Sequence, residues 1–462
     1  MNRLIFISCC MAVVMVGCAS MEDARKARLE HIDDFGAEIA VRHLERLREP
    51  LDLQACLEIA FAENYDVKRA ALNTMLAEMD KEAALANFYP RINVTADLFT
   101  WSHQNKMGNT FTQDKTYRDF DINATMPIIM PSVWLMYANK KLGVSIAELT
   151  EHYIHQRMVM DVTIAYYNCL RAEDNIAMLE TQVDAAKSQA ERIGGLAREG
   201  MAAAWQGEQA DYQHKARRAE LAIARRNFTS NKAALLQTMG VSPLNDITFL
   251  RTDDTFELAD ESVDKLVLTA LEQHPSLSIA DHQIIVNENN VRSAITAFIP
   301  TLSAFATMTF TSDSIAAFNK NIYGGFRGAW DLFSGFGDRA RYKTAKGYKH
   351  LAELDREATF ISIMMEVIRA QNTLKNACES YELAQAAYSS TKSKYIEYAA
   401  KQKEGMVTVN DMLDAQADMD RAQAILSSSK YQRHIALATL QMAMGSIGGE
   451  WLSEAERQRT TD

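Results

Sequence analysis

Residues 298–311 read FIPTLSAFATMTFT, and residues 88–100 read FYPRINVTADLFT. Each stretch opens with a phenylalanine and a proline that close a long helical pattern, and then alternates between apolar and polar residues. Proline disfavours the helical conformation at the residue before it, so the helix ends there. Alternation with a period of two residues is typical of a strand with one apolar face. The two stretches therefore predict a helix-to-strand transition that the chain makes twice.

Four segments share this alternating pattern, near residues 91–101, 117–127, 301–311 and 322–332. Each is about ten residues long with one apolar and one polar face, which is the length and pattern of a strand that crosses an outer membrane. Trp101 and Tyr117, at the far end of the first pair, suit a belt of aromatic residues at a membrane interface. A half-buried sheet in a water-soluble protein has the same alternation, so the pattern alone leaves both interpretations open.

The sequence contains two copies of one pattern. Phe88 and Pro90 recur as Phe298 and Pro300, an offset of 210 residues, and the dipeptide at 239–240 recurs at 444–445, an offset of 205 residues. Self-similarity at this scale marks a repeated structural unit. We predict a first structural repeat over residues 51–250 and a second over residues 251–447, followed by a C-terminal tail over residues 448–462. The acidic stretch 251–260 links the two copies.

Each copy contains two kinds of helical pattern. Residues 53–87 and 263–297 carry apolar residues at mixed spacings of three and four, which predicts one amphipathic helix in each copy. Residues 135–199 and 339–404 contain no proline. A helix of that size would rise about 100 Å, far more than a compact domain needs. The second pattern therefore predicts a helix that spans a distance larger than a compact domain.

The N-terminus has the pattern of an export signal. A short positive segment and an apolar run from Ile5 to Val16 precede Gly17 and Cys18, so we predict a signal peptide over residues 1–17. The sequence VGCAS at 16–20 resembles a bacterial lipobox, which implies lipidation of Cys18 and a lipidated tether over residues 18–50. Ala19 after the cysteine resembles sorting to the outer membrane. An ordinary signal peptide with an incidental cysteine is the alternative.

Composition and motifs argue against several classes of protein. The chain has 49 Lys and Arg against 60 Asp and Glu, a formal charge of −11, and this acidic balance excludes nucleic acid as the main partner. The cysteines form no CxxC pair, and His152 and His155 have no third ligand nearby in sequence, so we expect an exposed histidine pair and no metal site. No nucleophile and base are paired in the sequence, so we predict no catalytic residues, no cofactor and no enzyme.

Four strands are too few to close a barrel, and an open edge in lipid would leave backbone groups unsatisfied. Eight is about the smallest number of strands that closes. The export signal and the length of the helices, taken together with the alternating segments, favour membrane strands over a half-buried sheet in a water-soluble protein. The chain therefore needs at least one further copy of itself to complete a barrel.

At this point the sequence is identified as a member of the TolC-like outer-membrane efflux family, in its lipoprotein branch. The passages that carry the resemblance are Phe298-Ile299-Pro300-Thr301-Leu302, Trp330-Asp331-Leu332-Phe333-Ser334-Gly335, and Glu404-Gly405 followed by Asp411-Met412-Leu413-Asp414-Ala415-Gln416. The resemblance implies a mainly helical protein with membrane strands. It also implies a homotrimer with a shared 12-stranded transmembrane β-barrel, continued by a long periplasmic α-helical barrel. The first copy departs from the pattern, with MPIIMP at 126–131 in place of the Trp-Asp-Leu-Phe-Ser-Gly run.

The resemblance also implies positions for functional residues. Gly200 and Gly405 would lie in the periplasmic tip turns that contact a periplasmic adaptor, or membrane fusion, protein. Asp411 and Asp414 would form the periplasmic constriction, where threefold symmetry repeats them into a ring of up to six carboxylates. Each assignment has a plainer alternative, because glycine commonly ends a helix and acidic residues favour a helix N-terminus.

The function implied is a passive exit duct in the bacterial outer membrane, lipid-anchored and extending into the periplasm. It would conduct substrates from an inner-membrane transporter in a tripartite efflux or secretion system. Outer-membrane lipid, the adaptor and the transporter would be its partners. A non-conducting, lipid-anchored helical scaffold that spans the periplasm is the alternative, although a scaffold has no use for strands that face lipid.

Overall fold

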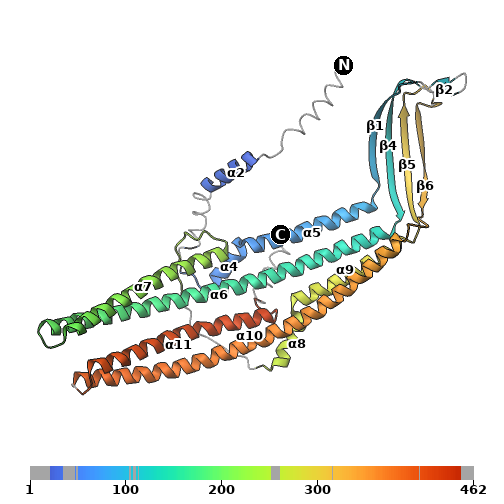
Figure 1. The fold of residues 1–462 in the computed structure, drawn as a ribbon. Helices are drawn as coiled ribbons and strands as arrows, with labels where there is room; N and C mark the ends of the chain where they lie inside the picture. The colour runs from blue at the N-terminus through green and yellow to red at the C-terminus, as the bar shows by residue number, and fades with distance from the viewer. Residues whose placement is uncertain are drawn as a thin grey trace. The chain divides into compact units, whose positions relative to one another are not determined.

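The computed structural model describes residues 21–34, 47, 50–103, 106–107, 111–112, 114–250, 261–314, 316–404 and 406–448. Within these residues the chain is mainly helical, and the order of two helices, two long strands and two helices occurs twice (Figure 1). The predicted fold class is therefore confirmed as mainly helical with a duplicated unit. The signal segment 1–17, Cys18 and Gly405 lie outside the described residues.

Helix α2 (Met21–Asp34) precedes the first copy. The first copy contains α4 (Leu53–Glu63), α5 (Tyr65–Leu85), the short 3-10 helix η2 (Ala86–Phe88), β1 (Arg91–Thr100), β2 (Lys106–Met107), β3 (Phe111–Thr112), β4 (Thr116–Ile129), α6 (Pro131–Arg198) and α7 (Ala204–Met239). The second copy contains α8 (Val263–Gln273), α9 (Pro275–Thr296), β5 (Thr301–Thr311), β6 (Lys320–Ala329), α10 (Gly337–Lys403) and α11 (Val409–Ala443).

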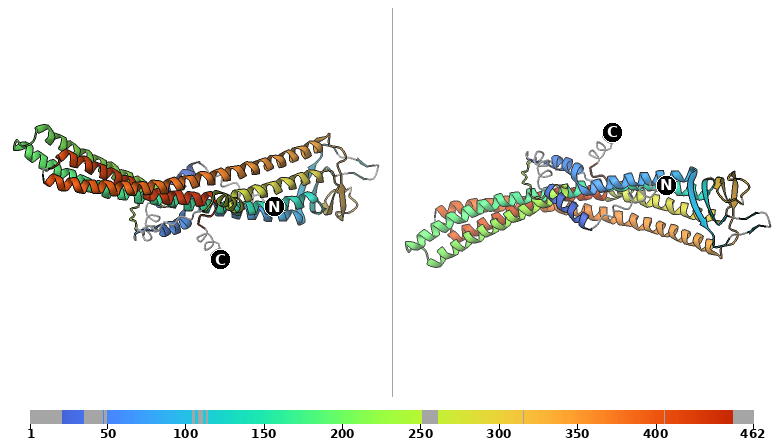
Figure 2. Two further views of the ribbon diagram at one scale, coloured as in Figure 1. Left: turned by 90° about the horizontal axis from the view of Figure 1, so that it is seen from below. Right: turned by 90° about the horizontal axis from the view of Figure 1, so that it is seen from above.

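The chain divides into two compact units, and the helices α6, α10 and α11 contribute residues to both. Unit 1 comprises Met1–Asn64, Asp161–Leu258 and Ala377–Ile435, and its described part holds the turns that join α6 to α7 and α10 to α11. Unit 2 comprises Tyr65–Met160, Ala259–Asn376 and Ala436–Asp462, and it holds the sheet. In both views of Figure 2, α7 lies alongside the C-terminal part of α6 within unit 1.

The prediction of one helix over 53–87 and one over 263–297 is wrong, because each segment forms two helices. In the second copy, α8 ends at Gln273, and His274 has a ψ of 122° directly before Pro275, as expected for the residue before a proline. In the first copy, Asn64 has a ψ of 129° and its side-chain amide donates to the carbonyl of Thr238 at 2.6 Å. The first break therefore depends on a partner far along the chain.

The repeated Met-Gly dipeptides lie against these two breaks. Gly240 ends α7 with a φ of 80°, and a Cβ at this position would overlap the backbone of Glu63 and Asn64. Gly445 has a φ of 70°, and a Cβ there would lie 3.0 Å from the Cα of His274. Only glycine combines a positive φ with so close a backbone approach. The repeat thus preserves one packing arrangement, a helix end against a helix break, in both units.

The core of unit 1 forms around the same helix end. Tyr166, Leu235, Leu236 and Met239 are almost fully buried, with at most 1% of their surface exposed. The Tyr166 hydroxyl donates to the carbonyl of Leu250 at 3.0 Å, so its polar atom is satisfied. Burying side chains of this size contributes about 1.5–3 kcal/mol each. This packing holds the C-terminal end of α7 against α6 near Tyr166.

Unit 2 contains one antiparallel sheet with the strand order β1-β4-β5-β6. The pairing of β4 with β5 is interrupted by a register shift between Pro127 and Ile129, where Pro127 has no N–H to donate. Helix α6 starts at Pro131, immediately after this bulge. The predicted extension of the last strand to 332 is wrong, because β6 ends at Ala329 and a turn with positive φ at Gly335 and Phe336 precedes α10.

The two proline-free segments form α6 and α10, of 68 and 67 residues. Among the described residues, no helix has a stretch apolar enough to cross a lipid bilayer.

Candidate functional site

The sheet presents one continuous apolar face. Cross-strand pairs on this face include Val94 with Ile122, Ile122 with Met308, and Met308 with Ile322. The side chains are not covered within the chain, since Ile92 is 69% exposed and Phe326 is 74% exposed. An apolar surface of this kind, running across four strands, marks contact with another apolar medium or molecule.

The opposite face of the sheet is polar. Thr95 lies opposite Asp121, and Asp97 lies opposite Asp119. Asn123 accepts a hydrogen bond from the hydroxyl of Thr307 at 2.8 Å. Like charges placed directly across a strand pair repel, so these carboxylates require a hydrated surrounding. The two faces of the sheet are therefore suited to two different solvents.

Aromatic side chains flank the strands at both ends. Trp101 and Tyr117 lie at the ends of β1 and β4 that are far from the long helices, and the ring centroids of Phe99 and Tyr117 are 5.1 Å apart. At the other end, the Trp330 indole donates to the carbonyl of Phe298 at 3.2 Å, and Trp134 is 65% exposed. Tryptophan and tyrosine in two such belts are typical of strands that end at membrane–water interfaces.

Gly200 lies in the turn between α6 and α7, as predicted. Its φ is 74°, its N–H donates to Ala197, and the N–H of Met201 donates to the carbonyl of Leu196. These two bonds form a Schellman motif, which ends a helix and lets the chain reverse. In the second copy Gly405 lies outside the described residues, but the N–H of Met406 donates to the carbonyl of Lys401 at 2.9 Å, the bond equivalent to Met201–Leu196.

Asp411 caps the N-terminus of α11 together with Thr408. The carboxylate accepts from the Thr408 hydroxyl at 2.6 Å and from the Thr408 backbone N–H at 3.0 Å, and the N–H of Asp411 donates back to that hydroxyl at 3.2 Å. This is a reciprocal capping box. The hydrogen bond from the Thr408 side chain, followed by the one from its backbone, holds the pKa of Asp411 below its ordinary value. Asp411 is therefore a fixed and ionised carboxylate at the turn.

Asp414 lies one turn further along α11, and its side chain is exposed, like that of Asp411. The hydrogen bond that Lys394 on α10 donates to Asp418 at 3.0 Å is the main cause of the raised pKa of Lys394, and the charge of Asp414 is the smallest of its contributors. Residues three apart on a helix lie on the same side of it. Within one chain, the fold thus brings two exposed carboxylates to the first turns of α11.

The equivalent turn in the first copy has a different chemistry. Under the 205-residue offset, Thr408, Asp411 and Asp414 correspond to Ala203, Gln206 and Gln209. Gln206 still accepts from the N–H of Ala203 at 3.0 Å, but alanine cannot return the bond. Half of the cap is kept in the first copy and neither acid is present. The acidic pair is therefore not needed to form the turn.

Several interior polar contacts gave no recognisable signal in the sequence. Asp174 on α6 accepts from the hydroxyl of Tyr431 on α11 at 2.7 Å. His155, predicted to be exposed, is 8% exposed, and its Nε2 lies 3.9 Å from a Glu151 carboxylate oxygen. These residues fall on helix faces that the sequence alone does not assign to a neighbour. In the described part of the chain, no group of three or more His, Cys, Asp or Glu residues is placed to hold a metal ion.

Comparisons with known proteins agree with this architecture. TolC of Vibrio cholerae is 23% identical over 374 residues, covering 78% of this chain and 82% of the relative, and TolC of Escherichia coli is 20% identical over 415 residues, covering 87% and 83%. The CmeC outer membrane channel of Campylobacter jejuni has a TM-score of 0.75 at 18% identity, covering 85% of both chains. The open-state MtrE channel of Neisseria gonorrhoeae has a TM-score of 0.71 at 15% identity, covering 85% of this chain and 88% of that one.

The sequence model of one family matches both copies separately, over residues 56–241 and 266–446, and its description is "Outer membrane efflux protein". These two segments make up most of the chain and contain all four long strands of the sheet. The protein therefore belongs to the outer membrane efflux protein family.

Proposed function

We propose that the protein is the outer-membrane exit duct of a tripartite export system, which passively conducts substrates from an inner-membrane pump across the periplasm and the outer membrane. The observation that carries this proposal is the exposed apolar face of the sheet, unbroken across four strands and backed by a polar face. Hydrocarbon on one side and water on the other satisfy both faces at once. Family membership supports the same assignment.

The two edges of the sheet explain why the duct needs more than one chain. Strands β1 and β6 each have a single partner strand in the described sheet. In hydrocarbon, each unsatisfied backbone N–H or C=O costs several kcal/mol, so an open edge does not persist there. Sister chains supply the missing partners. Three copies of a four-stranded sheet give the 12 strands of a barrel wide enough to enclose water.

The helical hairpins complete the duct on the periplasmic side. The long helices α6 and α10 each follow a strand of the sheet in the sequence, and α6 is followed by the turn at Gly200. In the proposed assembly the turns at Gly200 and Gly405 contact the hairpins of a periplasmic adaptor protein, which joins the duct to the pump. Exposed apolar side chains in this region, such as Met201 and Met406, support a protein contact there.

Asp411 and Asp414 form the constriction in this proposal. Threefold symmetry repeats the two carboxylates into a ring of up to six, which attracts cations to the narrow end of the duct. The hydrogen bonds that hold Asp411 at the start of α11, and the replacement of both acids by glutamines in the first copy, support a role beyond capping. The ring would act as a filter and a gate at the periplasmic entrance.

The N-terminus anchors each chain in the proposal. Cys18, lipidated after removal of residues 1–17, places acyl chains in the outer membrane, where each buried CH₂ contributes about 0.8 kcal/mol. Growth of expressing cells with labelled palmitate tests this directly. Label is expected on the wild-type chain and not on Cys18→Ser, whereas a labelled Cys18→Ser chain would place the lipid elsewhere.

Solvent accessibility of alternate positions in β5 tests the duct. Single cysteines are introduced at residues 303, 304 and 306–309 in a chain whose own cysteines other than Cys18 are replaced, and intact outer membranes are treated with a membrane-impermeant thiol reagent. Positions 303, 307 and 309, on the polar face, are expected to react, and positions 304, 306 and 308, on the apolar face, are expected to stay protected. Position 305 is omitted because Phe305 departs from the alternation.

The fractionation of the same chains distinguishes the duct from a scaffold. A duct is expected as a heat-modifiable trimer in outer-membrane extracts. A monomer released with the soluble periplasmic proteins, with all the introduced cysteines equally reactive or equally protected, would contradict the proposal. A monomer with the same reactivity that stays with the membrane would leave the lipid-anchored scaffold.

A further inference from the structure

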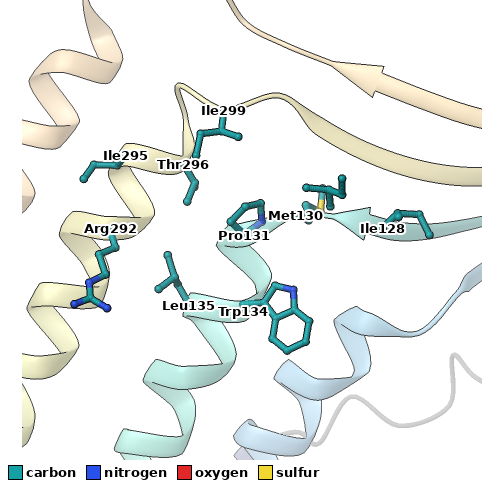
Figure 3. A pocket seen from close by; sticks show the side chains of 10 residues that line it. Ile128, Met130, Pro131, Trp134, Leu135, Arg292, Ile295, Thr296 and Ile299 are labelled. Atoms are coloured by element: carbon teal, nitrogen blue, oxygen red, sulfur yellow. The ribbon is translucent and has the colours of Figure 1, made fainter.

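An open groove lies in unit 2 where the strands meet the helices (Figure 3). Its volume is about 490 Å³, within the usual range for small-molecule sites. Figure 3 shows side chains from α6 on one side and from α9 on the other, with the end of β4 above them. The groove is lined by Ile128, Ile129, Met130, Pro131, Trp134, Leu135, Arg292, Ile295, Thr296 and Ile299.

The groove continues the apolar face of the sheet. The bulge at the end of β4 shifts the register so that Ile129 pairs with Leu302, and Leu302 belongs to the same face as Met308. Ile128 and Ile129 are 46% and 51% exposed, so this face does not end in a packed core. Whatever medium covers the sheet therefore also reaches the groove.

The groove has a charged end. Arg292 is the one charged residue among the described residues that line it, and it lies on α9 about one turn before the helix ends at Thr296, on the side away from the strands. Its side chain is 62% exposed and it donates to Glu288 at 3.3 Å. Glu288 is held more closely by Lys349, at 2.6 Å. The guanidinium therefore keeps N–H donors available for a further acceptor.

Arg292 is not part of the repeated framework. Under the 210-residue offset it corresponds to Glu82, which has the opposite charge. The aromatic residue of the groove, Trp134, is 65% exposed beside the strand ends. An exposed tryptophan, an apolar wall and a cation at the end away from the strands follow the order expected across a membrane interface.

We propose that this groove binds one phospholipid of the periplasmic leaflet, with an acyl chain against Ile129 and Ile299 and the phosphate at Arg292. The proposal rests on the proposed function, because it takes the apolar face of the sheet to lie in the outer membrane. The charge at one end favours a lipid over a second copy of the chain, since phosphate forms strong, bidentate hydrogen bonds with arginine. The lipid would seal the junction between strands and helices.

The test uses the full-length chain purified in detergent, stripped of lipid and titrated with phosphatidylglycerol, with binding followed by native mass spectrometry. One tightly held lipid per chain is expected. Arg292→Gln is expected to raise Kd by about tenfold or more, as loss of a charge-assisted hydrogen bond implies. Arg356→Gln is the matched control, because Arg356 is an exposed arginine of unit 2 that pairs with Asp281 at 3.4 Å outside the groove.

One further variant and one further lipid identify the molecule that occupies the groove. Ile295→Trp fills the groove and is expected to remove the tight site while the oligomer is unchanged. Diacylglycerol, which lacks the phosphate, is expected to bind the wild type and Arg292→Gln equally weakly. Equal Kd values for phosphatidylglycerol in the wild type and Arg292→Gln would overturn the proposal. So would tight binding that occurs only in Cys18→Ala, because the chain's own acyl groups would then occupy the groove.

Failure of this proposal is separable from failure of the proposed function. The lipid titration needs no pore, and the conductance of the same preparations is measured in planar bilayers. Current steps with no tight lipid site refute the lipid proposal alone. Absence of current steps from an inserted oligomer refutes the duct, whatever the lipid titration shows.

Discussion

At the start of α11, helix capping and exposed charge are divided among Thr408, Asp411 and Asp414. Thr408 and Asp411 cap the helix through hydrogen bonds, whereas Asp414 is exposed beyond the cap. Removing Thr408 therefore weakens the cap and keeps both charges. Removing the two acids takes away both charges. This difference allows the effect of charge to be measured apart from the effect of helix capping.

The double substitution Asp411→Ala with Asp414→Ala tests the constriction. We expect a higher single-channel conductance and a block by multivalent cations that is weaker by about tenfold, since close unit charges in water interact by about 1 kcal/mol per pair. Thr408→Ala serves as the control and is expected to leave the cation block unchanged. Unaltered single-channel behaviour in the double variant would remove both acids from the constriction.

The lowered pKa of Asp411 sets the pH range of the cation block. A carboxyl group whose pKa is lower in the folded state contributes stability above its unfolded pKa, near 3.8, and loses it as the pH falls through the folded value. We therefore expect the block to be constant from pH 8 to about pH 5 and to weaken only in stronger acid. Titrating cation block against pH in planar bilayers measures this. A block lost between pH 7 and pH 6 would point to a histidine in place of Asp411.

The glycines at the helix ends differ in what an added methyl group would meet. Gly200 has open space around its Cβ position, whereas a Cβ at Gly240 would overlap the backbone of Glu63 and Asn64. We expect Gly200→Ala to cost about 1–2 kcal/mol, the strain of a positive φ. Gly240→Ala adds about 1–3 kcal/mol of overpacking to that strain. Thermal unfolding followed by circular dichroism compares the two, and equal midpoints would contradict the close approach at Gly240.

At the scale of elements, the helix breaks show what the sequence could and could not predict. His274 precedes Pro275, and this proline is a local signal for the second break. The apolar spacing typical of a helix continues on both sides of the proline, so the spacing alone predicts one helix. Asn64 precedes no proline, and its extended conformation is held by the Thr238 carbonyl, 174 residues away. A contact of that range is not encoded by any local pattern. The first break could therefore only be found in the fold.

The strands were predictable for the opposite reason, because alternation is local. The alternating apolar residues of all four segments fall on one face once the strands are paired, as Ile122, Met308 and Ile322 show, whereas Phe99 and Phe305 fall on the other. Strand ends were less predictable. The bulge at Pro127 keeps β4 paired up to Ile129, whereas the second copy ends β6 at Ala329 and enters α10 through a turn. These exits depend on how each strand meets its helix.

Arginine substitutions on adjacent residues of β5 test which face of the sheet meets lipid. Met308 lies on the apolar face and Thr309 on the polar face, opposite Ile122 and Asp121 respectively. We expect Met308→Arg to cost about 2–4 kcal/mol near the bilayer midplane and to reduce the trimer in outer-membrane extracts. Thr309→Arg is expected to assemble normally. Equal assembly of the two variants would show that the apolar face does not lie in hydrocarbon.

At the scale of the whole molecule, the duplication makes the family identifiable even at low sequence identity. Both copies match the same family model separately, although the TolC relatives are only 20–23% identical to the chain. The features that the two copies share are physical: alternation in the strands, long proline-free helices, and a glycine where a helix end meets a helix break. Interior polar contacts such as Asp174–Tyr431 join segments far apart in the sequence and could not be predicted from these patterns.

The central claim is that each chain contributes an incomplete sheet that sister chains close around water. Purified full-length protein reconstituted into planar bilayers, with the number of chains per complex counted by native mass spectrometry, tests it most directly. The account predicts complexes of three chains that give discrete single-channel current steps. Single chains, or trimers that insert without any current, would contradict it.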